Sequence, residues 1–146
     1  MAPATGDPRP PADVDAAAAF VLDRYRVFAV VGASPRTWRP SQGVMRTLIA
    51  HGYEVVPVNP TCDDVLGRVC YPDLASIPAS VGVEVVDIFR RSDRAGAHVD
   101  EAIAIGARAV WMQLGVIDED AAQRARDAGL AVVMDRCPAI ELRRAR

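Results

Sequence analysis

Arginine is the only strongly basic side chain in this sequence, and this limits the chemistry that the chain can perform. The 17 residues counted as Lys or Arg are all Arg. Without Lys, the chain cannot supply a P-loop phosphate lysine, a Schiff-base lysine or a lysine general base. The cationic contacts to a phosphate must therefore come from arginine side chains, with backbone N–H groups as further donors.

Small, polar and cationic residues follow each of five apolar segments. Turn geometry alone favours Gly, Pro, Asn and Ser at such positions, so each residue taken singly has a structural alternative. Their coincidence at all five segment ends indicates a polar binding site. The residues concerned are Gly32, Ala33, Ser34, Asn59, Pro60, Phe89, Arg90, Gln113, Gly115 and Arg136.

The loop after the first apolar segment could hold a pyrophosphate. Gly32 allows a close approach of backbone to ligand. We expect Ser41 to cap a helix over residues 41–51, whose unpaired N–H groups and positive dipole end attract an anion. Arg36 and Arg39 could supplement these donors. The glycines here do not reproduce the G-x-G-x-x-G spacing, so the loop alone does not identify a dinucleotide.

The end of the second apolar segment discriminates between nucleotides. NAD-binding sheets usually end their second strand with an Asp or Glu that accepts a hydrogen bond from the adenosine ribose. Here the segment ends in Val58, Asn59 and Pro60, and the next carboxylates, Asp63 and Asp64, are expected to be solvated loop charges. The missing carboxylate argues against NAD and suits a ribose that carries phosphate.

Two arginines at segment ends have competing interpretations. Arg90 follows a buried segment, where its guanidinium could bind phosphate through two hydrogen bonds. The alternative is an ion pair with Asp87 or Asp135. Arg136 could contact the same ligand, or it could lock the last loop together with Asp135.

The pattern contains no recognisable catalytic set. Ser34 has no His with an orienting acid placed to activate it, so we expect its hydroxyl to bind phosphate. His51 and His98 have no nucleophile or metal partner in the pattern. We therefore expect a binding protein with no catalytic and no metal-ligating residues.

The elements that must position these residues alternate along the chain. Short β-branched runs predict strands, and helix-prone runs predict the helices between them. Ser92 or Asp93 and then Asp118 are expected to cap the last two helices. The strands are expected over residues 26–31, 53–58, 83–89, 107–112 and 130–134, the helices over 13–25, 41–51, 92–106 and 118–129, and one helical turn near 72–77.

This alternation predicts an α/β fold: a single Rossmann-like, doubly wound domain with a five-stranded parallel sheet and helices on both faces. Ligands bind such sheets beyond the carboxyl ends of the strands, where the predicted site residues gather.

Length and composition are those of one soluble domain. The chain has 146 residues, of which 51% are hydrophobic and 25% charged. Residues 1–11 include four prolines and are expected to form a flexible tail before the domain at 12–146. A net charge of −2 argues against nucleic acid and membrane partners. The three cysteines form no C-x-x-C pair and fit reduced thiols in the cytoplasm.

Six blocks of the sequence closely resemble the small bacterial CoA-binding proteins. That family is similar in turn to the CoA-binding domain of the succinyl-CoA synthetase α subunit. The resemblance covers Val27 to Glu141. The blocks are VGASP (31–35), RPS (39–41), GYEVVPVNP (52–60), DIFR (87–90), WMQLG (111–115) and MDRCP (134–138).

The resemblance implies a coenzyme A site. It would place Gly32, Ala33 and Ser34 at the pyrophosphate, Asn59 and Pro60 beside the adenosine, and Phe89, Arg90, Gln113 and Gly115 along the remaining crevice. The phosphohistidine of the synthetase lies in a second domain, for which this chain has no room. The synthetase also uses a lysine near the end of its second strand, which this sequence lacks.

A bound CoA raises one question about the thiols. Cys137 precedes a proline at a predicted sheet end, so it could form a mixed disulfide with CoA under oxidising conditions. The alternative is that Cys137 is a small residue filling a turn.

Three functions are consistent with these observations. The leading one is a non-catalytic CoA or acyl-CoA binding protein that acts as a carrier, sensor or regulator and could form a homodimer. The second is an NAD(P)-binding or acyl-CoA-processing enzyme completed by a partner chain. The third is an interaction scaffold, for which Arg90→Ala would behave like the parent in every ligand assay.

Overall fold

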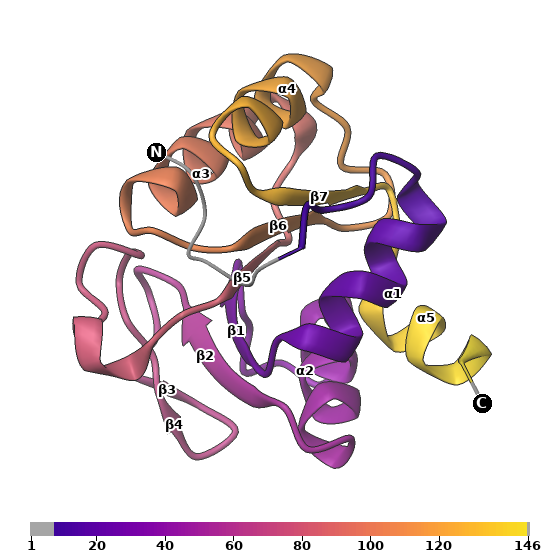
Figure 1. The fold of residues 1–146 in the computed structure, drawn as a ribbon. Helices are drawn as coiled ribbons and strands as arrows, with labels where there is room; N and C mark the ends of the chain where they lie inside the picture. Colours follow the sequence, from indigo (N-terminus) through magenta and orange to yellow (C-terminus); the bar gives the residue numbers. More distant parts are fainter. Residues whose placement is uncertain (1–7, 146) are drawn as a thin grey trace.

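A five-stranded parallel sheet forms the centre of the computed structural model, which describes residues 8–145 (Figure 1). The sheet order is β2-β1-β5-β6-β7, with every neighbouring pair parallel. This confirms the predicted α/β, Rossmann-like fold. The strands are β1 (Val27–Val31), β2 (Glu54–Val58), β5 (Val85–Ile88), β6 (Ala109–Met112) and β7 (Ala131–Met134).

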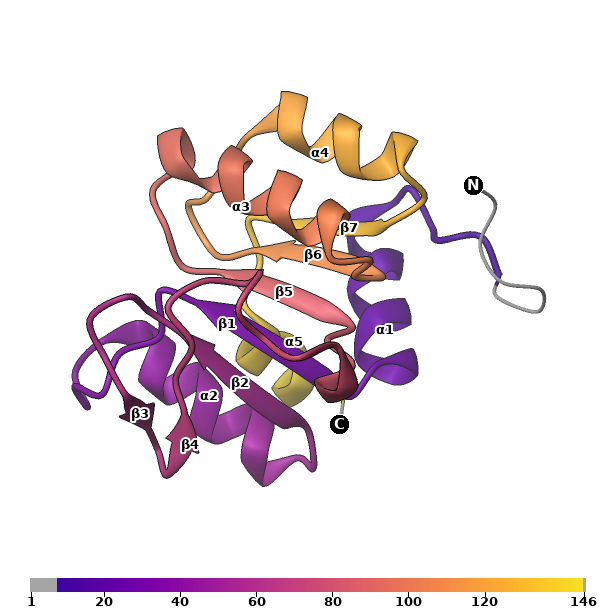
Figure 2. The same cartoon turned by 90° about the vertical axis from the view of Figure 1, so that its left-hand side faces the viewer.

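Helices cover both faces of the sheet because the strands are apolar on both sides. Phe28 and Val30 of β1 belong to one buried cluster, and Ala29 and Val31 to the other. The first cluster includes residues of three helices, and the second includes residues of two, on the opposite face (Figures 1 and 2). These are α1 (Val14–Arg24), α2 (Pro40–Ala50) and α5 (Pro138–Arg144) on one side, and α3 (Ser92–Ala104) and α4 (Glu119–Asp127) on the other.

The connection from β2 to β5 crosses the sheet without a regular helix. It contains a small hairpin of β3 (Asp64–Val65) and β4 (Arg68–Val69). The two residues of its turn, Leu66 and Gly67, both have positive φ, as a type I′ turn requires. Leu74 packs into the second cluster. Within the predicted helical turn near 72–77 the chain forms a hydrogen-bonded turn, in which the Ile77 amide donates to the Leu74 carbonyl at 3.2 Å, and the 3-10 helix η1 follows at Ala79–Val81.

Helix starts differ from the predicted caps at two places. Ser41 does not cap α2, because Pro40 begins the helix after Arg39, and Ser41 is buried inside the first turn. Neither Ser92 nor Asp93 caps α3, which follows Arg91 without a side-chain cap. Asp118 does cap α4, since its Oδ1 accepts a hydrogen bond from the Ala121 amide at 3.0 Å.

Two features of the chain ends complete the fold. The sequence pattern did not predict α5, which begins directly after Cys137 and packs against α1 and α2. Residues 1–7 of the predicted tail lie outside the described residues, and residues 8–11 form no helix or strand. Among residues 8–145, no helix is long and apolar enough to cross a lipid bilayer.

Candidate functional site

A cavity of about 260 Å³ lies at the carboxyl ends of β1, β5 and β6. The chain runs from β1 to β2 on one side and then crosses to β5 on the other side of β1. The cavity therefore lies at the switch point of the sheet, where doubly wound folds bind ligands. It is lined by Gly32, Arg39, Pro40, Ser41, Phe89, Arg90, Gln113, Leu114 and Val116.

The predicted site residues divide into two groups. Gly32, Arg39, Ser41, Phe89, Arg90 and Gln113 line the cavity, and Ala33, Ser34, Asn59, Pro60, Gly115 and Arg136 do not. Pro40, Leu114 and Val116 also line it, although the sequence pattern did not single them out. In the sequence, only their positions next to Arg39, Gln113 and Gly115 indicated that they could line the site.

Gly32 is required by the packing of two strand ends. Its φ is +86°, and a Cβ there would lie 2.4 Å from the carbonyl oxygen of Phe89. The Gly32 amide donates to the Val58 carbonyl at 2.9 Å, and the Ala33 amide reaches the same oxygen at 3.3 Å. These two amides join the ends of β1 and β2, so the predicted anion cradle must draw its donors from elsewhere.

The first turn of α2 supplies a positive end to the cavity. Arg39 and Ser41 line it on either side of Pro40, and α2 is 11 residues long. Pro40 has no N–H and the Gln42 amide donates to the Arg39 carbonyl at 3.1 Å, so the Ser41 amide and the positive helix dipole are what this end offers to an anion. An anionic group in the cavity would meet both this helix end and the Arg39 guanidinium.

Arg90 brings a second guanidinium to the cavity. It forms no ion pair with Asp87 or Asp135, the two carboxylates that were its structural alternatives, or with any other residue from 8 to 145. Asp135 accepts instead from the Gly115 amide at 2.7 Å. The Arg90 guanidinium is therefore available to a ligand.

Gln113 lines the cavity and carries a buried amide oxygen. The residue is only 7% exposed, and its Oε1 is buried without a hydrogen-bond partner among residues 8–145. An unsatisfied buried polar group of this kind costs about 1–3 kcal/mol. A ligand N–H or O–H in the cavity could provide the missing donor.

The loop that follows Gln113 is held rigidly. The Val116 amide donates to the Gln113 carbonyl at 2.8 Å. The Ser92 hydroxyl donates to the Gly115 carbonyl at 3.2 Å and accepts from the Ile117 amide at 2.9 Å. These bonds fix Leu114 and Val116 at the cavity wall, so this side of the site is already formed.

Asn59 joins two loops beside the cavity. Its Nδ2 donates to the Ala33 carbonyl at 2.7 Å, and its Oδ1 accepts from the Thr61 amide at 2.9 Å. The side chain is thus occupied within the protein. Pro60, the next residue, is exposed. Ser34 lies partly buried in the adjoining loop, where its Oγ accepts from the Arg36 amide at 3.1 Å.

Arg136 and Cys137 contact other parts of the protein and do not line the cavity. The Arg136 guanidinium lies 3.5 Å from Asp15 of α1 and also donates to the Asp135 carbonyl at 3.0 Å. These contacts tie the last loop to α1, and Arg136 is not among the residues that line the cavity. Cys137 is buried in the first cluster directly before α5. Its placement agrees with a residue that fills a turn.

Asp87 is an unexpected buried carboxyl group on β5. It lies opposite Val30 and Trp111 in the sheet, and both carboxyl oxygens are buried without a hydrogen-bond partner among the described residues. Burial holds the pKa of Asp87 well above its usual range, because desolvation disfavours the charged form. The cavity lining does not include it.

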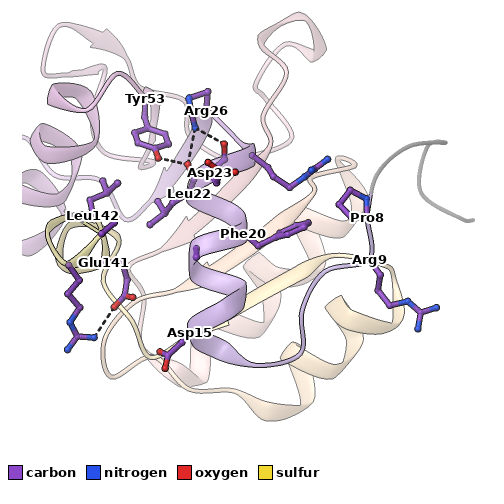
Figure 3. Close-up of a pocket in the computed structure, with 14 residues that line it drawn as sticks. Pro8, Arg9, Asp15, Phe20, Leu22, Asp23, Arg26, Tyr53, Glu141 and Leu142 are labelled. Carbon is purple, nitrogen blue, oxygen red and sulfur yellow. Dashed lines mark hydrogen bonds and ion pairs between the residues drawn. The ribbon is translucent and has the colours of Figure 1, made fainter.

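A larger groove of about 890 Å³ lies elsewhere, beside α1 and α5 (Figure 3). Its polar groups are largely occupied by one another. Arg26 donates to the Leu22 carbonyl at 2.9 Å, Tyr53 donates to the same oxygen, and Arg144 pairs with Glu141 at 3.5 Å. The smaller cavity is the better candidate site, because it combines unpaired cationic and polar groups with a helix N-terminus.

Several known proteins are similar to this chain. The protein YneT of Bacillus subtilis strain 168 is 36% identical over 117 residues, which cover 80% of this chain and 85% of YneT. A hypothetical protein from Pyrococcus horikoshii OT3 has a solved structure that is 40% identical with a TM-score of 0.84, covering 96% of this chain and 98% of that chain.

A longer enzyme chain contains a similar unit. The dinucleotide-forming acetyl-coenzyme A synthetase 1 of Ca. Korarchaeum cryptofilum is 27% identical with a TM-score of 0.64. The match covers 75% of this chain but only 25% of the synthetase chain. The CoA binding domain family matches residues 26–143, which include the whole sheet and every residue that lines the cavity. The chain therefore belongs to the CoA binding domain family.

Proposed function

We propose that the protein binds coenzyme A, free or acylated, in the cavity at the switch point. The observation that carries the proposal is that one cavity is lined both by Arg90, whose guanidinium is available, and by Gln113, whose amide oxygen has no partner among the described residues. CoA offers a matching chemistry, because its pyrophosphate is anionic and its pantetheine arm carries amide N–H groups. Membership of the CoA binding domain family supports the same ligand.

The dimensions of the cavity suggest which part of CoA it holds. Its volume of about 260 Å³ lies just below the ~300–1,000 Å³ of pockets that enclose a drug-sized ligand. The cavity therefore suits the pyrophosphate and part of the pantetheine arm. The adenosine would extend along the surface toward Asn59 and Pro60, the end that the family resemblance assigned to it.

We further propose that binding occurs without chemical turnover, so that the protein acts as a carrier, sensor or regulator. The residues that line the cavity include Ser41 as a hydroxyl but no His, Cys, Asp or Glu. Ser41 has no general base among them, so the lining supplies no acid–base pair. Binding free energy, rather than proton transfer, is what this lining can contribute.

Calorimetric titration with CoA, dephospho-CoA and NAD tests the ligand. We expect CoA to bind and NAD to bind more weakly or not at all, and preferential binding of NAD would overturn the proposal. Arg90→Gln should weaken CoA binding about ten- to a hundredfold, since charge-assisted hydrogen bonds contribute roughly 1.5–3 kcal/mol. Arg91→Gln is the matched control, because Arg91 is exposed and pairs with Asp93 at 3.1 Å.

One observation favours a second function. The similar unit in the Korarchaeum synthetase is a quarter of a longer enzyme chain, so a partner chain could supply catalytic groups here as well. Under this alternative, the pure protein would bind CoA but process acyl-CoA only after the partner is added. Turnover of acyl-CoA by the protein alone would contradict the non-catalytic proposal.

A further inference from the structure

The loop between β1 and α2 carries an exposed tryptophan with two arginines against it. Trp38 is 68% exposed. The guanidinium carbon of Arg39 lies 4.8 Å from the centroid of its ring, and that of Arg36 lies 5.9 Å away. Within residues 8–145, neither arginine forms an ion pair with a carboxylate. We call Arg36, Trp38 and Arg39 the Trp38 cluster.

The base of this loop is fixed to its surroundings. The Ala33 carbonyl accepts from Asn59 at 2.7 Å, which ties the loop to the end of β2. The Pro35 carbonyl accepts from Gln42 of α2, also at 2.7 Å. Figure 2 shows the loop projecting from the sheet between β1 and α2. The Trp38 cluster thus extends from anchored positions.

The cluster is continuous with the cavity. Arg39 both lines the cavity and stacks on Trp38, so the indole ring lies next to the site through this one side chain. Arg36 lies on the same ring but does not line the cavity. These three arginines therefore follow an order: Arg90 and Arg39 lie at the cavity, and Arg36 lies outside it.

Coenzyme A has two separate anionic groups, the pyrophosphate and the ribose 3′-phosphate. Since the chain has no Lys, arginine is the strongly cationic side chain that can bind either group. We propose, on the basis of the function proposed above, that Arg36 binds the 3′-phosphate while the Trp38 ring lies against the adenosine. Arg90 and Arg39 then remain for the pyrophosphate.

The ratio of affinities for CoA and dephospho-CoA tests this assignment, because the two ligands differ only in the 3′-phosphate. The parent protein should bind CoA about tenfold more tightly than dephospho-CoA, as expected for one charge-assisted contact. Arg36→Gln should reduce this ratio to near one while leaving dephospho-CoA binding unchanged. Arg90→Gln should weaken both ligands alike and preserve the ratio, and Arg91→Gln should alter neither affinity.

The outcomes separate the two proposals. If the parent binds neither ligand, the proposed function fails. If it binds CoA and the ratio survives in Arg36→Gln, CoA binding stands and the 3′-phosphate subsite is refuted. A ratio near one in the parent also refutes the subsite, because Arg36 then makes no contact with the phosphate.

Tryptophan fluorescence provides an independent readout. The chain has two tryptophans, and Trp111 is fully buried. Saturating CoA should therefore change the emission of the exposed Trp38, and Trp38→Phe should abolish that change while retaining most of the binding. A full CoA-dependent signal in Trp38→Phe would show that the adenosine lies elsewhere.

Discussion

Gly32 and Phe89 lie so close that a side-chain carbon on the glycine would sit 2.4 Å from the phenylalanine carbonyl oxygen. Gly32 follows β1 and Phe89 follows β5. These are the two neighbouring strands at which the order of strand connection reverses. Both residues line the cavity. The floor of the candidate site is thus set by a backbone contact that only glycine permits.

Replacing Gly32 by Ala should therefore damage both stability and binding. The left-handed φ costs about 1–2 kcal/mol for a residue with a Cβ, and the contact with Phe89 adds to it. We expect the free energy of unfolding to fall by at least about 2 kcal/mol in urea titrations, with CoA binding weakened as Phe89 moves. Gly43→Ala is the control: it lies in α2 with nothing within 4 Å of the added carbon, and should raise stability by about 0.5–1 kcal/mol.

Asp87 should make the protein less stable as pH rises. Burial raises the pKa of Asp87 in the folded state, whereas the unfolded chain keeps a value near ~3.9. Between these two pKa values the folded state retains a proton that the unfolded state has released. The free energy of unfolding then decreases with increasing pH, by up to about 1.4 kcal/mol per pH unit.

Two substitutions separate the charge of Asp87 from its polarity. Asp87→Asn should remove its contribution to the pH dependence but leave an unpaired polar group. Asp87→Val should also remove that group and raise stability by about 1–3 kcal/mol at neutral pH. Urea titrations at several pH values measure both effects. Equal pH profiles for the parent and Asp87→Asn would show that Asp87 has an undetected partner.

Replacing Gln113 by Met should keep or raise the stability of the protein but lower its affinity for CoA. Gln113→Met keeps the length of the side chain but removes the unpaired buried oxygen, so we expect stability to be unchanged or up to about 1 kcal/mol higher. CoA affinity should fall by about five- to tenfold if the amide contacts the ligand. Gln123→Met, on the exposed surface of α4, should leave affinity unchanged. A Gln113→Met variant with parental affinity would remove this residue from the site.

The strands and their ends were predictable from sequence because their causes are local. Runs such as Val27–Val31 are apolar on both faces, and this is what a strand between two helical layers requires. The polar residues after them fell at the correct edge of the sheet. Asp118 was predicted to cap a helix and does so, since its carboxylate bonds an amide only three residues away.

The errors concern contacts between distant residues. The Ser92 hydroxyl forms hydrogen bonds with Gly115 and Ile117 of a distant loop and does not cap its own helix. The residues around Ser92 in the sequence do not indicate this. Arg136 was placed at the site, but its partner Asp15 comes from the other end of the chain. Arg90 and Arg136 look alike in sequence, and only their tertiary surroundings separate an available guanidinium from an occupied one.

The cysteines should react with thiol reagents in an order set by burial. Cys62 is partly exposed, whereas Cys70 and Cys137 are buried. Burial also raises the pKa of the Cys70 thiol, which lowers its thiolate fraction near neutral pH. We therefore expect Cys62 to react first with a disulfide reagent in the folded protein, and Cys137 only after denaturation. Peptide mapping after incubation with oxidised CoA measures this order, with Cys62→Ser as the control that removes the early product. Rapid formation of a CoA mixed disulfide at Cys137 in the folded protein would show that this thiol faces the ligand after all.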